Sequence, residues 1–301
     1  MPYWKSSEQL GLDSRKFESK PINRESTSLT VDEADCLQKV ALRAFEQHEY
    51  FKRMRSEVVV PNSIPILYFG NLPKYVTPGK KVVTVGLNPS NKEFLCNDRK
   101  KSSNGPNSYS ALCRFGERTF RKPKDEVSSN KYQDALNRYF ENEPYMNWFK
   151  KLDPLLEGFH CSFGGKFLPR KYTALHTDIA STTATFPTYS RLRNDVKREL
   201  FNEGFTLWTD LIEKCLKPDY ILLSGNDVIR KELQKKYGVL GLDDSVGRIQ
   251  FGPRKTVLYS EKFIYEKNVV FVYGTNSRSG PFGNLKDTEK REIGRILSES
   301  E

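Results

Sequence analysis

The sequence is poor in the residues that build metal centres and redox sites. It holds only three histidines and five cysteines in 301 residues. The histidines show no metal-ligand spacing, and no two cysteines stand close enough to suggest a zinc knuckle or an iron–sulfur cluster. We therefore expect no metal and no organic cofactor, and the odd, scattered cysteines predict reduced thiols. The cysteines are Cys36, Cys96, Cys113, Cys161 and Cys215.

Long apolar runs are missing as well. No stretch of about 18 apolar residues occurs, which argues against a membrane-spanning helix. Residues 1–20 are polar and of mixed charge, without the apolar segment of a secretion signal. The sequence therefore predicts a cytoplasmic protein without a membrane partner, and we expect it to be a monomer.

Positive charge is in clear excess. The chain carries 49 Lys and Arg against 38 Asp and Glu, a formal net charge of +11. Such a surplus favours a polyanionic partner, because neutralising phosphates releases their counterions. Nucleic acid, DNA above all, is the partner we expect, although a generically basic protein would show the same composition.

The first part of the chain predicts a helical extension. Apolar residues recur at helical spacing over residues 31–55, and Thr30 with Glu33 fits a capping box. We divide the chain into an N-terminal helical extension, residues 1–60, and an α/β domain, residues 61–301. A polar and basic insertion at about residues 96–130 interrupts the domain.

Short apolar strands alternate with helices over the rest of the chain. Strands are expected at residues 66–69, 82–85, 172–179, 220–223, 257–259 and 269–273. Helices are expected at residues 132–140, 145–156, 191–202, 207–216, up to 237, and at 286–298, with Gly204 as a stop between two of them. This alternation predicts a three-layer α/β/α sandwich with a mostly parallel central sheet.

Polar or glycine-rich loops follow four of the expected strands. They begin at Asn88, Asp178, Ser224-Gly225 and Asn276. Ligands of parallel sheets bind beyond the carboxyl ends of the strands, so these loops should gather around one cavity.

The loops together resemble a known family. Gly86-Leu87-Asn88-Pro89-Ser90 after a buried strand resembles the first catalytic motif of the uracil-DNA glycosylase superfamily, particularly its mismatch-specific and single-strand-selective branches. Leu175-His176-Thr177-Asp178-Ile179 resembles the strand with the base-reading residue. Residues 220–228 resemble the later strand–glycine–helix unit, and Gly274-Thr275-Asn276-Ser277-Arg278-Ser279-Gly280 resembles the loop that grips the DNA backbone. The order matches the family over about residues 64–298, and the fold implied is uracil-DNA glycosylase-like.

The resemblance implies hydrolysis of an N-glycosidic bond, which passes through an oxocarbenium-like sugar with water as nucleophile. Asn88 would position that water. Its amide is no strong base, so catalysis would rest on geometry and electrostatics. Faster branches of the family carry a carboxylate there, so a slow enzyme is expected. The alternative is that Asn88 caps the following turn.

Asp178 departs from the family, which usually has Asn at this place to read uracil. An ionised Asp accepts a hydrogen bond from an exocyclic amine, which suits cytosine N4 rather than uracil O4. A neutral carboxylic acid there could also donate towards N3. The target base is therefore predicted to be cytosine-derived, including modified cytosine. Asp178 could instead cap the strand end or pair with an arginine.

The remaining site residues are assigned by resemblance and by residue type. Asn276 would hold the base O2 or a phosphate, although the proline usual after that position is missing. Aromatic faces stack on an extruded base, while serines and arginines bind phosphates. The candidate base contacts are Phe115, Phe94, His176 and Gly86. The candidate DNA contacts are Ser90, Ser277, Arg278, Ser279, Arg114 and Arg118. Each aromatic could be simple core, and the glycine-rich loop an ordinary turn.

These patterns predict a monofunctional DNA glycosylase that leaves an abasic site, because no lysine for lyase chemistry stands beside the motifs. One branch of the superfamily removes modified cytosines from phage DNA, which implies antiviral defence in the bacterial cytoplasm or nucleoid; DNA repair of uracil or mismatches is the related alternative. A non-catalytic nucleic-acid-binding protein on the same fold and a small-molecule nucleoside hydrolase are the other classes. The high charge argues against the last of these.

Overall fold

The computed structural model describes residues 29–96, 108–116, 126–225, 227–241, 246–253, 255–275, 277 and 280–299. At the centre lies a seven-stranded sheet of order β4-β5-β1-β6-β9-β8-β7. The first five strands run parallel to their neighbours, and the last two are antiparallel. In sheet order the strands are β4 (Cys161–Ser162), β5 (Tyr172–Asp178), β1 (Val82–Gly86), β6 (Tyr220–Gly225), β9 (Lys267–Thr275), β8 (Thr256–Ile264) and β7 (Gly247–Gln250).

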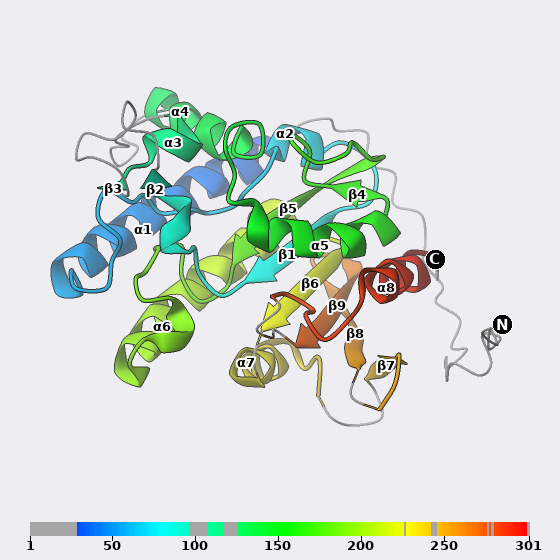
Figure 1. Ribbon diagram of the computed structural model, residues 1–301. Coiled ribbons are helices and arrows are strands. Elements are labelled where there is room, and N and C mark those ends of the chain that lie inside the picture. Colours follow the sequence, from blue (N-terminus) through cyan, green and yellow to red (C-terminus); the bar gives the residue numbers. More distant parts are fainter. Residues whose placement is uncertain are drawn as a thin grey trace.

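Helices flank this sheet, which confirms the predicted three-layer α/β/α sandwich (Figure 1). α1 (Val31–Met54) packs with α6 (Asn194–Asp210) and with the π-helical turn Leu211–Leu216 that continues α6. α5 (Met146–Gly158) packs against α8 (Asp287–Glu299). The other elements are α2 (Leu72–Tyr75), α3 (Leu112–Phe115), α4 (Glu126–Asn137), α7 (Asp227–Tyr237), a 3₁₀ turn Asn91–Glu93, a 3₁₀ turn Tyr189–Arg191 and the small sheet of β2 (Leu95–Cys96) and β3 (Ser108–Tyr109).

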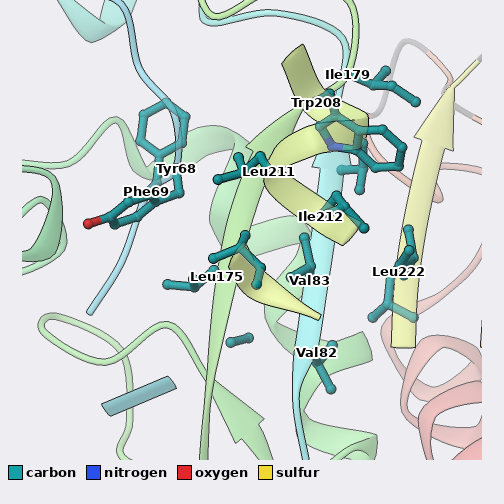
Figure 2. Close-up of a cluster of buried hydrophobic side chains, with 14 of the residues drawn as sticks. Tyr68, Phe69, Val82, Val83, Leu175, Ile179, Trp208, Leu211, Ile212 and Leu222 are labelled. Carbon is teal, nitrogen blue, oxygen red and sulfur yellow. The ribbon is translucent and has the colours of Figure 1, made fainter. Parts of the chain in front are cut away.

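The core joins the central strands to the helical layer formed by α6. Figure 2 shows Val83 of β1 on the face of the sheet where Ile212 and Trp208 lie. Leu222 of β6 pairs with Thr84, so it points to the opposite face. All four side chains are at most 2 % exposed. β1 is buried along its whole length, as expected for a strand covered on both faces of a parallel sheet. The sheet edge at the end of β1 is thereby held rigidly.

The N-terminal helix belongs to the same core. Thr30 and Glu33 form the predicted capping box. One face of α1 is buried in the main apolar cluster through Leu37, Val40, Ala41, Ala44 and Phe45. Among the described residues, no helix is both long enough and apolar enough to span a bilayer.

Three expected elements differ in the structure. Residues 66–69 form no strand, because Phe69 makes only a single bridge to His176. The two expected helices on either side of Gly204 are one continuous helix, α6. Gly204 is buried, and a Cβ added there would lie 2.1 Å from the carbonyl oxygen of Ala180. The glycine permits close packing of α6 on the loop after β5 and is not a stop signal.

The cysteines also differ from the prediction. Cys96 and Cys113 form a disulfide, with Cα atoms 5.9 Å apart, so the expectation of reduced thiols is wrong for this pair. Cys36 and Cys215 are free, and their Sγ atoms lie 3.1 Å apart. Two cysteines separated by 17 residues match no known sequence motif, so their pairing could not be predicted. The fold brings Cys96 and Cys113 together.

Gly204→Ala tests the close packing of α6. The added methyl group would meet the Ala180 carbonyl, so overpacking should lower the free energy of unfolding by about 1–3 kcal/mol. Urea denaturation measures this change. Asn202→Ala, on the exposed side of the same helix, is the control and should shift stability by less than about 0.5 kcal/mol. Equal stability of the two variants would show that Gly204 has no packing role.

Candidate functional site

Neighbouring parallel strands end together at one edge of the sheet. Gly86 at the end of β1 stands beside Asp178 at the end of β5. The backbone pairing continues past both strands, since Ala180 N donates to Leu87 O at 2.7 Å. On the other side β6 and β9 end together at Ser224–Gly225 and Gly274–Thr275. The structure therefore brings the loops that begin at Asn88, Asp178 and Ser224-Gly225 to one edge of the sheet. That they share one cavity with the loop at Asn276 stays a prediction.

Asp178 is buried at this edge without a hydrogen bond to its carboxylate. The residue is 6 % exposed, and its Oδ1 lies 3.7 Å from His176 Nε2, beyond hydrogen-bond distance. No other donor among the described residues reaches the carboxylate. A buried carboxylate without a hydrogen bond is costly, so its lone pairs can accept a donor from a ligand.

His176 faces Asp178 in a fixed orientation. Its Nδ1 lies 2.8 Å from Thr84 Oγ1, which leaves Nε2 towards the carboxylate. The ring is 3 % exposed and lies 5.2 Å from Phe149 and 5.6 Å from Phe69, between ring centroids. The predicted same-face placement of His176 and Asp178 is confirmed.

Gly86 allows the close approach of these groups. A Cβ added at Gly86 would lie 2.5 Å from Asp178 Oδ1 and 3.1 Å from His176 Nε2. The first distance is shorter than any normal contact, so a larger residue would displace the carboxylate. This gives the glycine of the first motif a physical reason.

Trp148 adds a second polar atom without a partner, and sequence reasoning missed it. The residue lies on α5, with its ring 6.3 Å from that of His176. Its Nε1 is buried, and the part of the chain that the structure describes offers it no acceptor. In the sequence, a tryptophan in an apolar helix is indistinguishable from an ordinary core residue. Only the missing hydrogen bond of Nε1 marks Trp148 as a candidate site residue.

Asn88 is oriented by the loop that follows β5. Its Nδ2 donates to Thr185 Oγ1 at 2.9 Å and to Thr183 O at 3.3 Å. The Oδ1 atom is then the group left to accept a hydrogen bond from a ligand or a water molecule. The amide orientation follows from these two acceptors.

The same loop is held by His48 of α1, another residue that sequence reasoning missed. His48 Nδ1 lies 3.2 Å from Thr183 Oγ1, and Nε2 lies 2.9 Å from Ser63 O. The carbonyl can only accept, so Nε2 carries the proton and Nδ1 accepts the Thr183 hydroxyl. Burial lowers the pKa of His48 from 6.5 to about 4. The N-terminal helix thus supports Asn88 through Thr183.

Glu93 is the third missed residue. It ends the 3₁₀ turn after the first motif and is 4 % exposed. Its Oε2 accepts the hydroxyl of Tyr139, which in turn accepts Tyr145 N at 2.9 Å. Burial raises the pKa of Glu93 to about 8, and the negative charge of Asp178 adds to this rise. An acidic residue in a polar segment is expected to be exposed to solvent, so the burial of Glu93 could not be predicted from the sequence.

The predicted stacking residues are interior. Phe94 and Phe115 are 0 % and 2 % exposed, and their rings stack on each other with centroids 5.6 Å apart. Phe115 continues to Tyr139 at 5.4 Å, and Tyr139 to Phe69 at 4.8 Å. The two rings belong to the aromatic cluster that reaches His176, and their base contact stays a prediction.

Two of the predicted DNA contacts make local hydrogen bonds. Ser90 Oγ caps the following turn, accepting Lys92 N at 3.2 Å. Arg114 is half-buried and donates from Nε to Lys92 O at 3.0 Å and from Nη1 to the Glu143 carbonyl. These bonds use two of the guanidinium nitrogens of Arg114 to hold α3 in place. Fewer of its N–H groups are therefore left to bind a phosphate.

Ser277 is exposed in the turn after β9 and pairs with Gly280 in both directions, at 3.1 and 2.9 Å. A Cβ added at Gly280 would lie 2.7 Å from Lys151 Cδ, so the exposed Lys151 of α5 stands beside this turn. Four predicted residues lie outside the described residues: Asn276, Arg278, Ser279 and Arg118.

Within the described ranges, no three His, Cys, Asp or Glu side chains group as metal ligands. Comparison of the chain with protein-family models, with curated proteins and with solved structures finds no match. The resemblance to the glycosylases therefore rests on the sequence motifs alone.

The pKa of His48 makes stability depend on pH. Since the folded pKa of about 4 lies below the ordinary 6.5, the unfolded chain binds the proton first. His48 therefore contributes stability above about pH 6.5 that is lost as the pH falls towards 4. Between about pH 7 and pH 5 the loss should be about 2 kcal/mol. Urea denaturation of wild type and His48→Gln at both values checks this: the variant should lose less, and equal losses would contradict it.

Proposed function

We propose that this protein is a monofunctional DNA glycosylase that flips out a cytosine-derived base, including modified cytosine, and leaves an abasic site. The observation that carries the proposal is the buried Asp178 carboxylate, which has no hydrogen-bond partner among the described residues. It lies at the edge where parallel sheets bind their ligands.

Base recognition follows from the atoms left without partners. The Asp178 carboxylate accepts an exocyclic amine, the group that distinguishes cytosine from uracil. The Nε1–H of Trp148 can only donate, which suits a carbonyl oxygen or ring nitrogen of the base. Gly86, which has no side chain, leaves room for the carboxylate to lie against the end of β1. Flipping the base out of the duplex costs unstacking free energy, and these contacts offset that cost.

Hydrolysis needs a water molecule placed against the sugar. Asn88 is anchored through its amide nitrogen, so Oδ1 can accept a hydrogen bond from that water. An amide does not remove the proton in advance, and the oxocarbenium-like sugar and the departing base carry the electronic change. The rate then depends on how firmly the Thr183–Thr185 loop holds the amide.

DNA binding is supported by charge. The net charge of +11 favours a polyanion, and Lys151 places a cation beside the turn at Ser277. The proposed role is removal of a non-standard base, as antiviral defence against modified phage DNA or as repair. Binding of DNA without base release would identify a non-catalytic nucleic-acid-binding protein instead.

Mass spectrometry of bases released from DNAs that contain cytosine, modified cytosines or uracil tests the proposal. Both duplex and single-stranded substrates are needed. The wild-type protein should release a cytosine-type base and leave an abasic site. Asn88→Ala should slow release by about 100-fold, because the water loses its acceptor. Failure of the wild-type protein to release a base from any of these DNAs would end the proposal.

Asp178→Asn tests base choice separately. The amide replaces one acceptor oxygen by a donor, so cytosine-type release should fall and uracil release should rise, changing their ratio by roughly 10- to 100-fold. Asp134→Asn makes the same chemical change at an exposed carboxylate and should leave the ratio unaltered. An unchanged ratio in Asp178→Asn would show that Asp178 does not read the base.

A further inference from the structure

We propose that Glu93 is the proton donor of this site: its neutral carboxylic acid hydrogen-bonds the bound base beside the Asp178 carboxylate and gives its proton to the base as it leaves. The inference rests on the proposed function. It assigns the two roles, donor and acceptor, to two different carboxyl groups.

The positions of the two carboxyl groups support this division. Glu93 stands five residues beyond Asn88 in the segment after β1, and Asp178 ends the neighbouring strand β5. Both are buried, at 4 % and 6 % exposure, and the negative charge of Asp178 contributes to the raised pKa of Glu93. Tyr139, bonded to Glu93, packs on Phe69, which packs on His176. These contacts, with that of His176 to Asp178, connect the acid and the carboxylate through the protein interior.

One carboxyl oxygen of Glu93 accepts a hydrogen bond from the protein, and the other can bind a ligand. Tyr139 donates to Oε2, and the described residues provide no hydrogen-bond partner for Oε1. The groups that act on Glu93 are Tyr139, the Arg114 guanidinium and Asp178. Burial outweighs the first two, so the pKa of about 8 keeps Glu93 protonated at neutral pH.

A neutral acid beside a carboxylate matches the edge of cytosine. That edge carries an amine donor at N4 next to an acceptor at N3, whereas uracil has an acceptor at O4 and a donor at N3. Two groups with separated proton states are the usual basis for dividing donor and acceptor roles in a site. The pair therefore explains preference for a cytosine-type base better than Asp178 alone.

The proton balance is complete without a further reactant. As the base–sugar bond breaks, its electron pair stays on the base, and the Glu93 proton passes to a ring nitrogen or carbonyl oxygen. The base leaves neutral and Glu93 becomes a carboxylate. Water adds its oxygen to the sugar carbon and releases a proton to solvent, from which Glu93 is protonated again.

The pH profile of base release tests this role. In the wild-type protein the rate should fall as the pH rises through about 8, because Glu93 loses its proton. Glu93→Gln keeps the shape and a donor for hydrogen bonding but cannot transfer the proton. It should release the cytosine-type base about 100-fold more slowly, without the alkaline decline. Glu141→Gln, at an exposed acid, should keep the wild-type rate and profile.

Tyr139→Phe gives a second readout if Glu93→Gln does not fold. The Tyr139 hydroxyl lowers the pKa of Glu93, so its removal should move the alkaline decline to higher pH. Infrared difference spectra should show a carboxylic-acid band at neutral pH in wild type that Glu93→Gln lacks. An alkaline decline that survives in Glu93→Gln, or that Tyr139→Phe leaves in place, would make Glu93 a structural acid only and leave the proposed function standing. No base release by wild type would instead remove both proposals.

Discussion

The pairing of β1 with β5 up to Gly86 and Asp178 is the constraint on which the site depends. Two parallel strands that end in register deliver their following loops to the same place, and the missing side chain of Gly86 lets the carboxylate of Asp178 sit against the backbone. The hydrogen bonds of Ile179 and Ala180 to Gly86 and Leu87 extend this pairing beyond the strands. The polar groups are therefore held by backbone geometry and by a rigid core.

Some side chains of the site are held in place by hydrogen bonds, whereas other polar atoms make none. Thr84 fixes His176, and the loop after β5 fixes Asn88, while Asp178 and Trp148 keep hydrogen-bonding capacity that the described residues do not use. A fold tolerates such buried polar atoms only at some cost in stability. They are the strongest physical sign that this edge binds something, and they are independent of any family resemblance.

The sequence predicted the layers of the fold well, but it did not predict the buried contacts that hold the site residues in place. β1 and β6 are continuous apolar runs, so their burial and their place in a parallel sheet were visible in advance. Gly204 was misread because a glycine at a close contact resembles a helix stop. Glu93 could not be found, since its partner Tyr139 lies 46 residues away and an acid in a polar segment reads as exposed. Local patterns report strands and turns, but a buried polar network is made by contacts between distant segments.

The contact of His48 with Thr183 has a consequence for the boundaries of the domain. A boundary at residue 60 would separate α1 from the α/β domain, yet His48 supplies the acceptor that orients the Thr183 hydroxyl, and Thr183 O receives the Asn88 amide. Cutting the chain at residue 61 would also expose the core face of α1's neighbours. The smallest unit that retains the hydrogen bonds around Asn88 therefore begins before α1, at its capping residue Thr30 or earlier.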